Sequence, residues 1–245
     1  MGHRVLYIPK PINPIFYPEY GLLYNWYAVA DTRNIAASGW RVGTYADYNT
    51  LRLFLAPGEP FNNNTAGGKL KETGFTHWNS PNTGATNESK FNARGTGHRL
   101  QSTGGYTALG QIQHLRTSTV IDAISSYTIS LSDASQTLTI YTVSGFKNGL
   151  PVRLVKESTS LSNGESGTYT GNDGKIYRTI CIGTQEWLAD NLSETRFRNG
   201  DTIPWYGANP ANYFTNAEWA ALTTAGCCAY DNTLANVATG FTFPT

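Results

Sequence analysis

The chain has 245 residues, a formal net charge of +1 and 14% charged side chains. This length is enough for one large domain or two small ones, each with a buried core. Without a basic run, wholesale binding to a phosphate backbone is not expected, so nucleic acid is excluded as a partner. A membrane-spanning helix needs about 18 consecutive apolar residues. No apolar run of the chain approaches that length, so no membrane span is expected. Abundant Gly, Ser, Thr, Asn and aromatic residues predict a β-rich chain with long loops.

The three cysteines, Cys181, Cys227 and Cys228, are too few for a disulfide framework. Adjacent cysteines bond to each other only with strain, so three free thiols are expected. On one strand Cys227 and Cys228 would point to opposite faces, which argues against joint chemistry. Residues 1–9 are too rich in proline and too poor in apolar residues for a signal peptide, which favours synthesis in a cytoplasm.

Residues 1–19 are predicted to form an extended arm. Pro9, Pro11, Pro14 and Pro18 prevent a helix. Apolar residues alternate with these prolines: Ile8, Ile12, Ile15, Phe16 and Tyr17. One interpretation is a floppy terminus, and the other is an arm that docks on a partner's surface.

The first half of the remaining chain contains one predicted helix and one predicted hairpin. A helix is expected over 44–54, capped by Thr44. Residues 56–100 are rich in Gly, Asn and Thr and indicate long structured loops. Alternating apolar and polar residues over 127–131 and 137–143 predict a β-hairpin.

The second half begins with a strand over 152–156 and a Ser/Gly/Asn-rich connector over 157–172. The turn Asp173-Gly174 leads into a strand over 175–182. A second short helix is expected over 216–222, with Asn216 as its cap and Trp219 facing inward.

Several blocks of the chain agree, at plausible spacing, with one known family. Two of them are Tyr20-Gly21-Leu22-Leu23-Tyr24-Asn25-Trp26-Tyr27 and Ile182-Gly183-Thr184-Gln185-Glu186-Trp187. In family order the blocks are 173–192, 228–232, 21–29, 39–42, 66–72, 77–89, 91–93 and 152–156. They resemble the Fibrobacter succinogenes major paralogous domain family. The family's opening block comes late in this chain, so the resemblance implies a circularly permuted order.

The resemblance implies an α+β, C-type-lectin-like fold, β-rich with two short helices and long structured loops. Residues 20–156 would be the C-terminal-type part of the family domain. Residues 173–245 would be its N-terminal-type part and would complete one domain with 20–156. We expect the strands over 152–156 and 175–182 to pair. Exchange of 173–239 between subunits is the alternative, because it would preserve every local contact.

Two further departures from the family affect the expected site. The closing strand has Leu154 where relatives often carry Cys, so Cys228 loses the disulfide partner that the resemblance implies. Region 111–126 lacks the aromatic-plus-serine motif of relatives, which leaves the binding face undefined.

The segment over 77–89 is the main candidate binding loop. Trp78 could stack on a sugar, while Asn79, Asn82, Asn87 and Glu88 could bond its hydroxyls or help to hold Ca²⁺. The alternative is that these side chains bond their own loop backbone. Few carboxylates converge here, so Ca²⁺ has weak support, and no other metal or cofactor is expected.

A second candidate contact is the pair Trp205-Tyr206, which is predicted to lie in a loop. It could be an exposed binding surface or part of the core.

Catalysis is not expected from the sequence. The histidines, His3, His77, His98 and His114, have no metal-ligand spacing. No nucleophile-elbow pattern accompanies the Ser, His and Asp residues. A C-type-lectin-like oxidase would use two cysteines and is the disfavoured enzymatic alternative.

The resemblance implies a non-enzymatic protein, because family members occur on Bacteroidetes surface proteins and in virion proteins of their phages. We expect a phage virion component: a head fibre, capsid decoration protein or tail-fibre component. It would join other virion proteins through its N-terminal arm, form a homotrimer by analogy with virion fibres, and bind a host surface glycan. The alternative is a glycan-binding module on a bacterial cell surface.

Overall fold

The computed structural model describes residues 15, 16, 18–208 and 213–244, and leaves the side chains of 140–144 undescribed. The strands are β1 (Leu23–Tyr24), β2 (Trp40–Val42), β3 (Thr96–Arg99), β4 (Tyr106–Leu109), β5 (Ile112–Val120), β6 (Ser125–Ser132), β7 (Ser135–Ser144), β8 (Leu154–Lys156), β9 (Ser166–Thr170), β10 (Ile176–Ile182), β11 (Gln185–Leu188) and β12 (Cys227–Cys228). The helices are α1 (Trp26–Val29), α2 (Tyr45–Leu55), α3 (Ala66–Leu70) and α4 (Asn216–Ala221), with 3₁₀ turns at Tyr230–Asn232 and Leu234–Asn236. The predicted α+β, β-rich class is confirmed.

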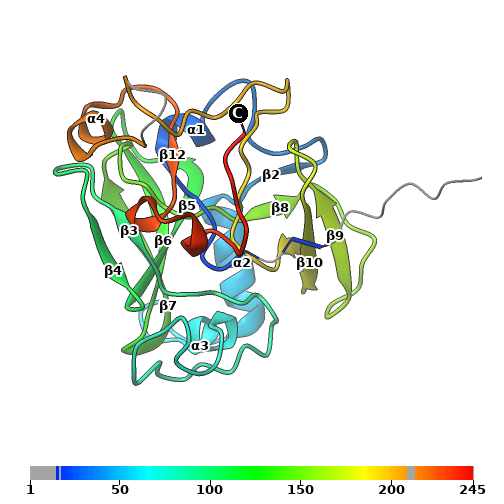
Figure 1. The fold of residues 1–245 in the computed structure, drawn as a ribbon. Coiled ribbons are helices and arrows are strands. Elements are labelled where there is room, and N and C mark those ends of the chain that lie inside the picture. The colour runs from blue at the N-terminus through cyan, green and yellow to red at the C-terminus, as the bar shows by residue number, and fades with distance from the viewer. Residues whose placement is uncertain (1–14, 17, 209–212, 245) are drawn as a thin grey trace, which may run out of the picture.

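Two five-stranded sheets and the helix α2 between them organise the fold (Figure 1). One sheet has the order β2-β8-β11-β10-β9, and the other has the order β4-β3-β5-β6-β7. Tyr48 and Leu51 of α2 are fully buried together with Ile129 of β6 and Trp187 of β11. Burying one face of α2 against both sheets removes its apolar side chains from water, which stabilises the arrangement.

The predicted helix over 44–54 is confirmed as α2, shifted by one residue. The Thr44 side chain accepts from the Asp47 N–H at 3.1 Å, and Asp47 accepts from the Thr44 N–H at 2.7 Å. This reciprocal capping box pairs N–H groups that a helix start leaves free.

The predicted helix over 216–222 is also present, as α4, but its predicted cap is wrong. Thr215, and not Asn216, accepts from the N–H of Glu218, and Glu218 accepts in return from the Thr215 N–H. The Thr-x-x-Glu spacing satisfies two donors, whereas Asn216 has no Glu or Gln three residues later. Trp219 is fully buried, as predicted.

The expectation of only two short helices is wrong, since the described residues form four. Asn25 caps α1 by accepting from the Ala28 N–H at 3.0 Å. α3 contains two glycines because a Cβ at Gly68 would lie 2.2 Å from the carbonyl oxygen of Gly84. Glycine lowers helix propensity, so the sequence alone did not indicate α3. The glycines are needed because α3 packs closely against the backbone near Gly84.

The predicted hairpin is confirmed as β6 and β7, which pair antiparallel up to Ser132 and Ser135. The predicted pairing of the strands over 152–156 and 175–182 is wrong. β11 lies between β8 and β10, because the turn at Gly183-Thr184 folds it back onto β10 and Trp187 then pairs with Val155 of β8.

The predicted connector over 157–172 is not plain loop. It contains β9, in which Thr168 and Tyr169 pair with Arg178 and Tyr177 of β10. A flanking hairpin thus gives β10 a partner on its other edge.

Strands that follow residue 156 complete sheets begun earlier in the chain. β9, β10 and β11 extend the sheet of β2 and β8, while β12 pairs with β1 through Leu23 and Cys228. Trp187 packs on Tyr48 within the same chain, with ring centroids 4.7 Å apart. The permuted family order remains a prediction from the sequence, and exchange between subunits remains the alternative to completion within one chain.

The last part of the predicted arm, which was expected either to be floppy or to dock on a partner, contacts its own chain. Phe16 packs edge-on against Tyr177 with ring centroids 5.5 Å apart, and its N–H donates to the carbonyl of Ile176. Ile15 forms a bridge with Ile176 and is 37% exposed. The remaining apolar residues named for the arm, Ile8, Ile12 and Tyr17, lie outside the described residues.

Candidate functional site

The predicted binding loop is held by its own hydrogen bonds. Trp78 is 1% exposed, and its Nε1–H donates to the carbonyl of Ala93 at 2.8 Å. Its role in stacking on a sugar is therefore corrected: the indole belongs to the core. The sequence could not show this, because an aromatic residue in a polar loop fits either an exposed contact or a core anchor.

The polar residues of this loop do not gather around a common point. The Asn82 Nδ2–H₂ donates to the carbonyls of Glu72 and Gly74, both at 2.9 Å. Asn87 bonds Asn92. Because their partners differ, these amides do not form the convergent oxygen set that Ca²⁺ requires.

The two remaining loop residues are exposed. Glu88 pairs with Lys69 at 3.2 Å. Asn79 lies at the surface, and its backbone N–H donates to the carbonyl of Gly110. Within the described ranges, no group of three or more His, Cys, Asp and Glu side chains is arranged to hold a metal ion.

In the described part of the chain, four cationic side chains are fully buried and bond to backbone carbonyls of separate segments: Lys71, Arg99, Arg116 and Arg153. Ammonium Nζ of Lys71 donates to three carbonyls, those of Thr83, Ser132 and Ser135, at 2.8–2.9 Å. Burial lowers the pKa of Lys71 to about 8. Three acceptors match the three donors of an ammonium group, so this lysine fixes a loop to the β6–β7 turn.

Arginines perform the same task elsewhere. Arg153 donates to the carbonyls of Phe91 and Leu188 at 2.7 and 2.9 Å, and to the Asn191 side chain. Arg99 donates to the carbonyls of Gly104 and Phe214 at 2.8 and 2.9 Å. A guanidinium presents five donors in a fixed plane, which suits it to bridge separate segments.

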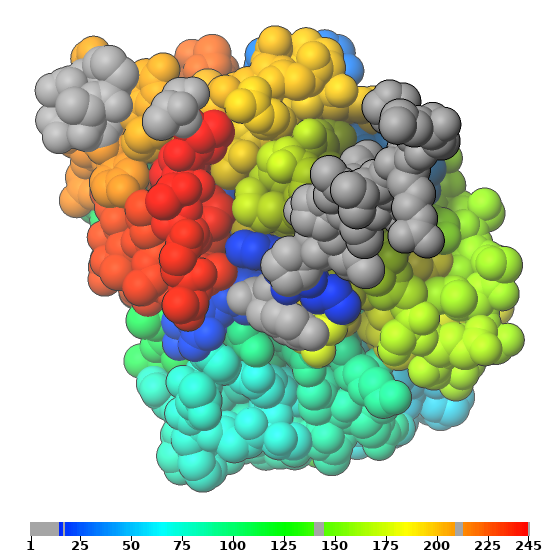
Figure 2. All heavy atoms as spheres, turned by 45° about the vertical axis from the view of Figure 1, so that its right-hand side comes forward, coloured from blue at the N-terminus to red at the C-terminus, as the bar shows by residue number. Residues whose placement is uncertain are grey.

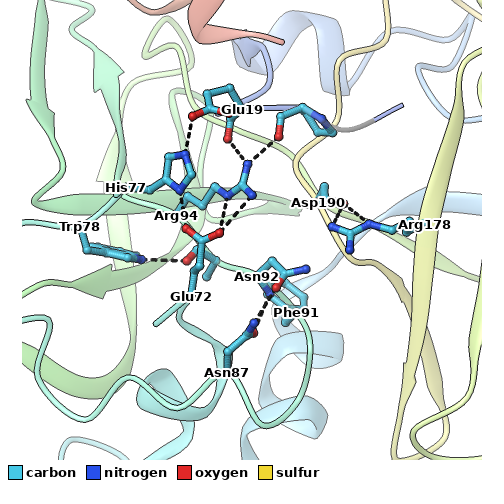
Figure 3. Close-up of polar contacts among 12 residues, drawn as sticks. Glu19, Glu72, His77, Trp78, Asn87, Phe91, Asn92, Arg94, Arg178 and Asp190 are labelled. Atoms are coloured by element: carbon cyan, nitrogen blue, oxygen red, sulfur yellow. Dashed lines mark hydrogen bonds and ion pairs between the residues drawn. The ribbon is translucent and has the colours of Figure 1, made fainter. Parts of the chain in front are cut away.

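A polar cluster surrounds His77, the first residue of the predicted binding loop, to which the sequence assigned no contact of its own. Its ring lies between the carboxylates of Glu19 and Glu72, and Arg94 bonds Glu72 at 3.0 Å (Figure 3). His77 and Glu19 are 58 residues apart, so no local spacing could have indicated the cluster.

The predicted contact pair Trp205-Tyr206 is split by the structure. Trp205 is partly buried and stacks on Phe243 with ring centroids 4.5 Å apart and an interplanar angle of 9°. Tyr206 is 39% exposed and lines an open pocket of about 440 Å³ beside α4. Its other lining includes Pro204, Phe214 and Leu222, with the Glu218 carboxylate as a polar group.

All three thiols are buried and free. Cys227 and Cys228 belong to different core clusters, consistent with adjacent residues on opposite faces of a strand. Burial is the main cause that raises the pKa of each of the three. A raised pKa keeps a thiol protonated and unreactive.

The fold and site define a β-rich α+β domain whose loops are fixed by buried cations. The model of the Fibrobacter succinogenes major domain matches residues 13–156. The chain therefore belongs to that family. Comparisons with curated proteins and with solved structures found no significant match. No helix of the described part has the length and apolar content to cross a membrane.

Proposed function

We propose that the protein is a non-enzymatic, C-type-lectin-like recognition module that serves in a phage virion, as a fibre, capsid decoration or tail-fibre component. The observation that carries the proposal is the set of buried cations that fix the loops. A surface held in one conformation before binding loses little conformational entropy when a ligand arrives. Such a rigid loop surface suits adhesion and assembly.

The pocket beside α4 is the proposed ligand site, and its ligand class is a host surface glycan. Tyr206 offers an exposed aromatic ring to the apolar face of a sugar. Glu218 supplies a carboxylate, although its oxygens already accept from Ala208 and Thr215. Apolar walls with few polar groups are the usual composition of such sites.

The titratable groups support binding rather than catalysis. Buried Lys71 and Arg153 bond backbone carbonyls, and the raised pKa of Cys227 and Cys228 disfavours a thiolate. A catalytic role would instead need a group that is both accessible and poised to exchange a proton or attack.

A glycan array with the whole protein tests the ligand site. We expect Tyr206→Ala to weaken binding by about 1–3 kcal/mol, the scale of a lost apolar contact. Phe75→Ala is the matched control, because Phe75 is an aromatic residue 65% exposed on another loop. Equal effects of both substitutions, or no binding by the unaltered protein, would contradict a glycan site here.

Antibody labelling of intact phage particles tests the location. Labelled virions support the proposal, whereas labelling only of bacterial cells would support a surface module. We propose a homotrimer as the assembled form, joined to other virion proteins through the N-terminal arm. Light scattering of the purified protein that gives the mass of a single chain would contradict the trimer.

A further inference from the structure

His77 is enclosed by two carboxylates on opposite sides of its ring. It is 7% exposed, with Nε2 lying 2.6 Å from Glu19 and Nδ1 hydrogen-bonded to Glu72 (Figure 3). A neutral imidazole carries one N–H, so one of these contacts would set a lone pair against a carboxylate. Both contacts are satisfied together only when the ring is protonated.

The charges around the ring balance in that state. Glu19 and Glu72 supply two negative charges, and Arg94 with protonated His77 supplies two positive charges. Tyr20 packs edge-on against the His77 ring with centroids 5.1 Å apart. Loss of the proton would leave the cluster with one uncompensated negative charge, which is costly where water is partly excluded.

Glu19 belongs to a short segment, residues 18–22, that joins several parts of the fold. Arg94 donates to the carbonyl of Pro18 at 2.6 Å, and the N–H of Glu19 donates to Val237 at 2.7 Å. Asn191 donates to the carbonyl of Tyr20 at 2.9 Å. In Figure 2 the blue residues of this part lie between the red C-terminal segment and the cyan and green loops.

The backbone approaches closely at the end of the same segment. Gly21 has φ +77°, and a Cβ there would lie 2.8 Å from Cβ of Asn191. Glycine is required by both the conformation and the space. Residues 18–22 therefore have one defined position on the rest of the fold, and the His77–Glu19 contact lies near the N-terminal end of this segment.

We propose that His77 is a pH-dependent latch that holds segment 18–22 when protonated and loosens it when deprotonated. The two carboxylates raise the pKa of His77 against the effect of burial. When folding raises the pKa of a base, protonation stabilises the folded state. This stabilisation is complete below the pKa of the unfolded state, about 6.5 for histidine, and it is lost as pH rises through the pKa of the folded state. The latch is thus closed in mild acid and opens on the alkaline side.

Hydrogen exchange of backbone amides between pH 5.5 and 9, corrected for intrinsic rates, tests the latch. The amides of Glu19 and Tyr20 should lose protection as pH rises, by roughly tenfold for each unit by which the pKa of His77 is raised. A ring-nitrogen NMR titration of His77 should give the same midpoint. Amides of β6 report whether the whole protein stays folded.

Glu19→Gln separates the latch from general packing, because a carboxamide can donate to a neutral imidazole. This variant should lower the pKa of His77 and flatten the pH dependence of protection. Glu88→Gln, an exposed carboxylate paired with Lys69, is the control and should leave both unchanged. Unchanged protection across the pH range, an unmoved midpoint in Glu19→Gln, or a neutral His77 at pH 6 would each overturn the latch.

Discussion

Arg153 binds Phe91 in two ways at once. Its Nη1–H donates to the carbonyl of Phe91 at 2.7 Å, and its guanidinium carbon lies 4.3 Å from the centroid of the Phe91 ring. The same guanidinium reaches the carbonyl of Leu188 in β11. One side chain thus joins the loop after α3 to β11, the middle strand of the β2-β8-β11-β10-β9 sheet.

Arg153→Met keeps the apolar bulk but removes every donor. We expect a loss of about 3–5 kcal/mol in the free energy of unfolding, because carbonyls that stay buried lose their partners. Urea unfolding measures the change. Arg196→Met is the control, since Arg196 bonds an exposed carbonyl of Gly200 and should cost about 0.5 kcal/mol or less. Similar losses of stability in both variants would contradict the inference that the buried bonds of Arg153 stabilise the fold.

Trp78→Ala should reduce stability, with any change in ligand binding only secondary to unfolding. We expect a loss of about 3–5 kcal/mol, the usual cost of deleting a buried aromatic side chain. Trp78→Phe should cost less, because it loses mainly the hydrogen bond to Ala93. Thermal unfolding and a glycan-binding assay below the melting temperature distinguish the two roles. Lost binding in a fully stable Trp78→Ala protein would restore the sugar-stacking interpretation.

Glu194 makes the free energy of unfolding depend on pH, and replacing its carboxylate should remove that dependence. Burial and the neighbouring Asp173 raise the pKa of Glu194 to about 8. Because its folded pKa lies above the unfolded value, about 4.3, the stability it adds is present below that value and lost as pH rises through about 8. Glu194→Gln should therefore flatten the fall in the free energy of unfolding between pH 5 and pH 9.

Urea unfolding at pH 5, 7 and 9 measures that slope for both proteins. Glu165→Gln is the control, because it replaces a carboxylate outside the Asp173–Glu194 pair. A slope in Glu194→Gln equal to that of the unaltered protein would show that Glu194 is already ionised near pH 5.

The three thiols should react slowly with a disulfide reagent while the protein is folded. Cys181 and Cys227 are fully buried and Cys228 is 2% exposed, and burial raises the pKa of each. Reaction in urea should count three thiols per chain. Rapid labelling of native protein at pH 7 would contradict this and would revive the oxidase alternative.

The sequence by itself determined some of the local elements, among them α2 and the β6–β7 hairpin, and the family. Helix α2 follows from Thr44, Asp47 and an apolar period that a helix must bury, and β6–β7 follows from alternation of polar and apolar residues. These features depend on neighbours a few residues away, so they can be read directly along the chain. Family membership likewise depends on the order and spacing of residues.

Only the tertiary structure decided the pairing of strands and the roles of the polar residues. β11 separates β8 from β10, and Trp78 is core rather than surface. His77 meets Glu19 across 58 residues, and Arg153 meets Phe91 across 62. Whether a side chain is buried, and which partner a charge has, depends on segments that are distant in the sequence and pack together in the fold. The spacing of residues along the chain therefore does not predict them.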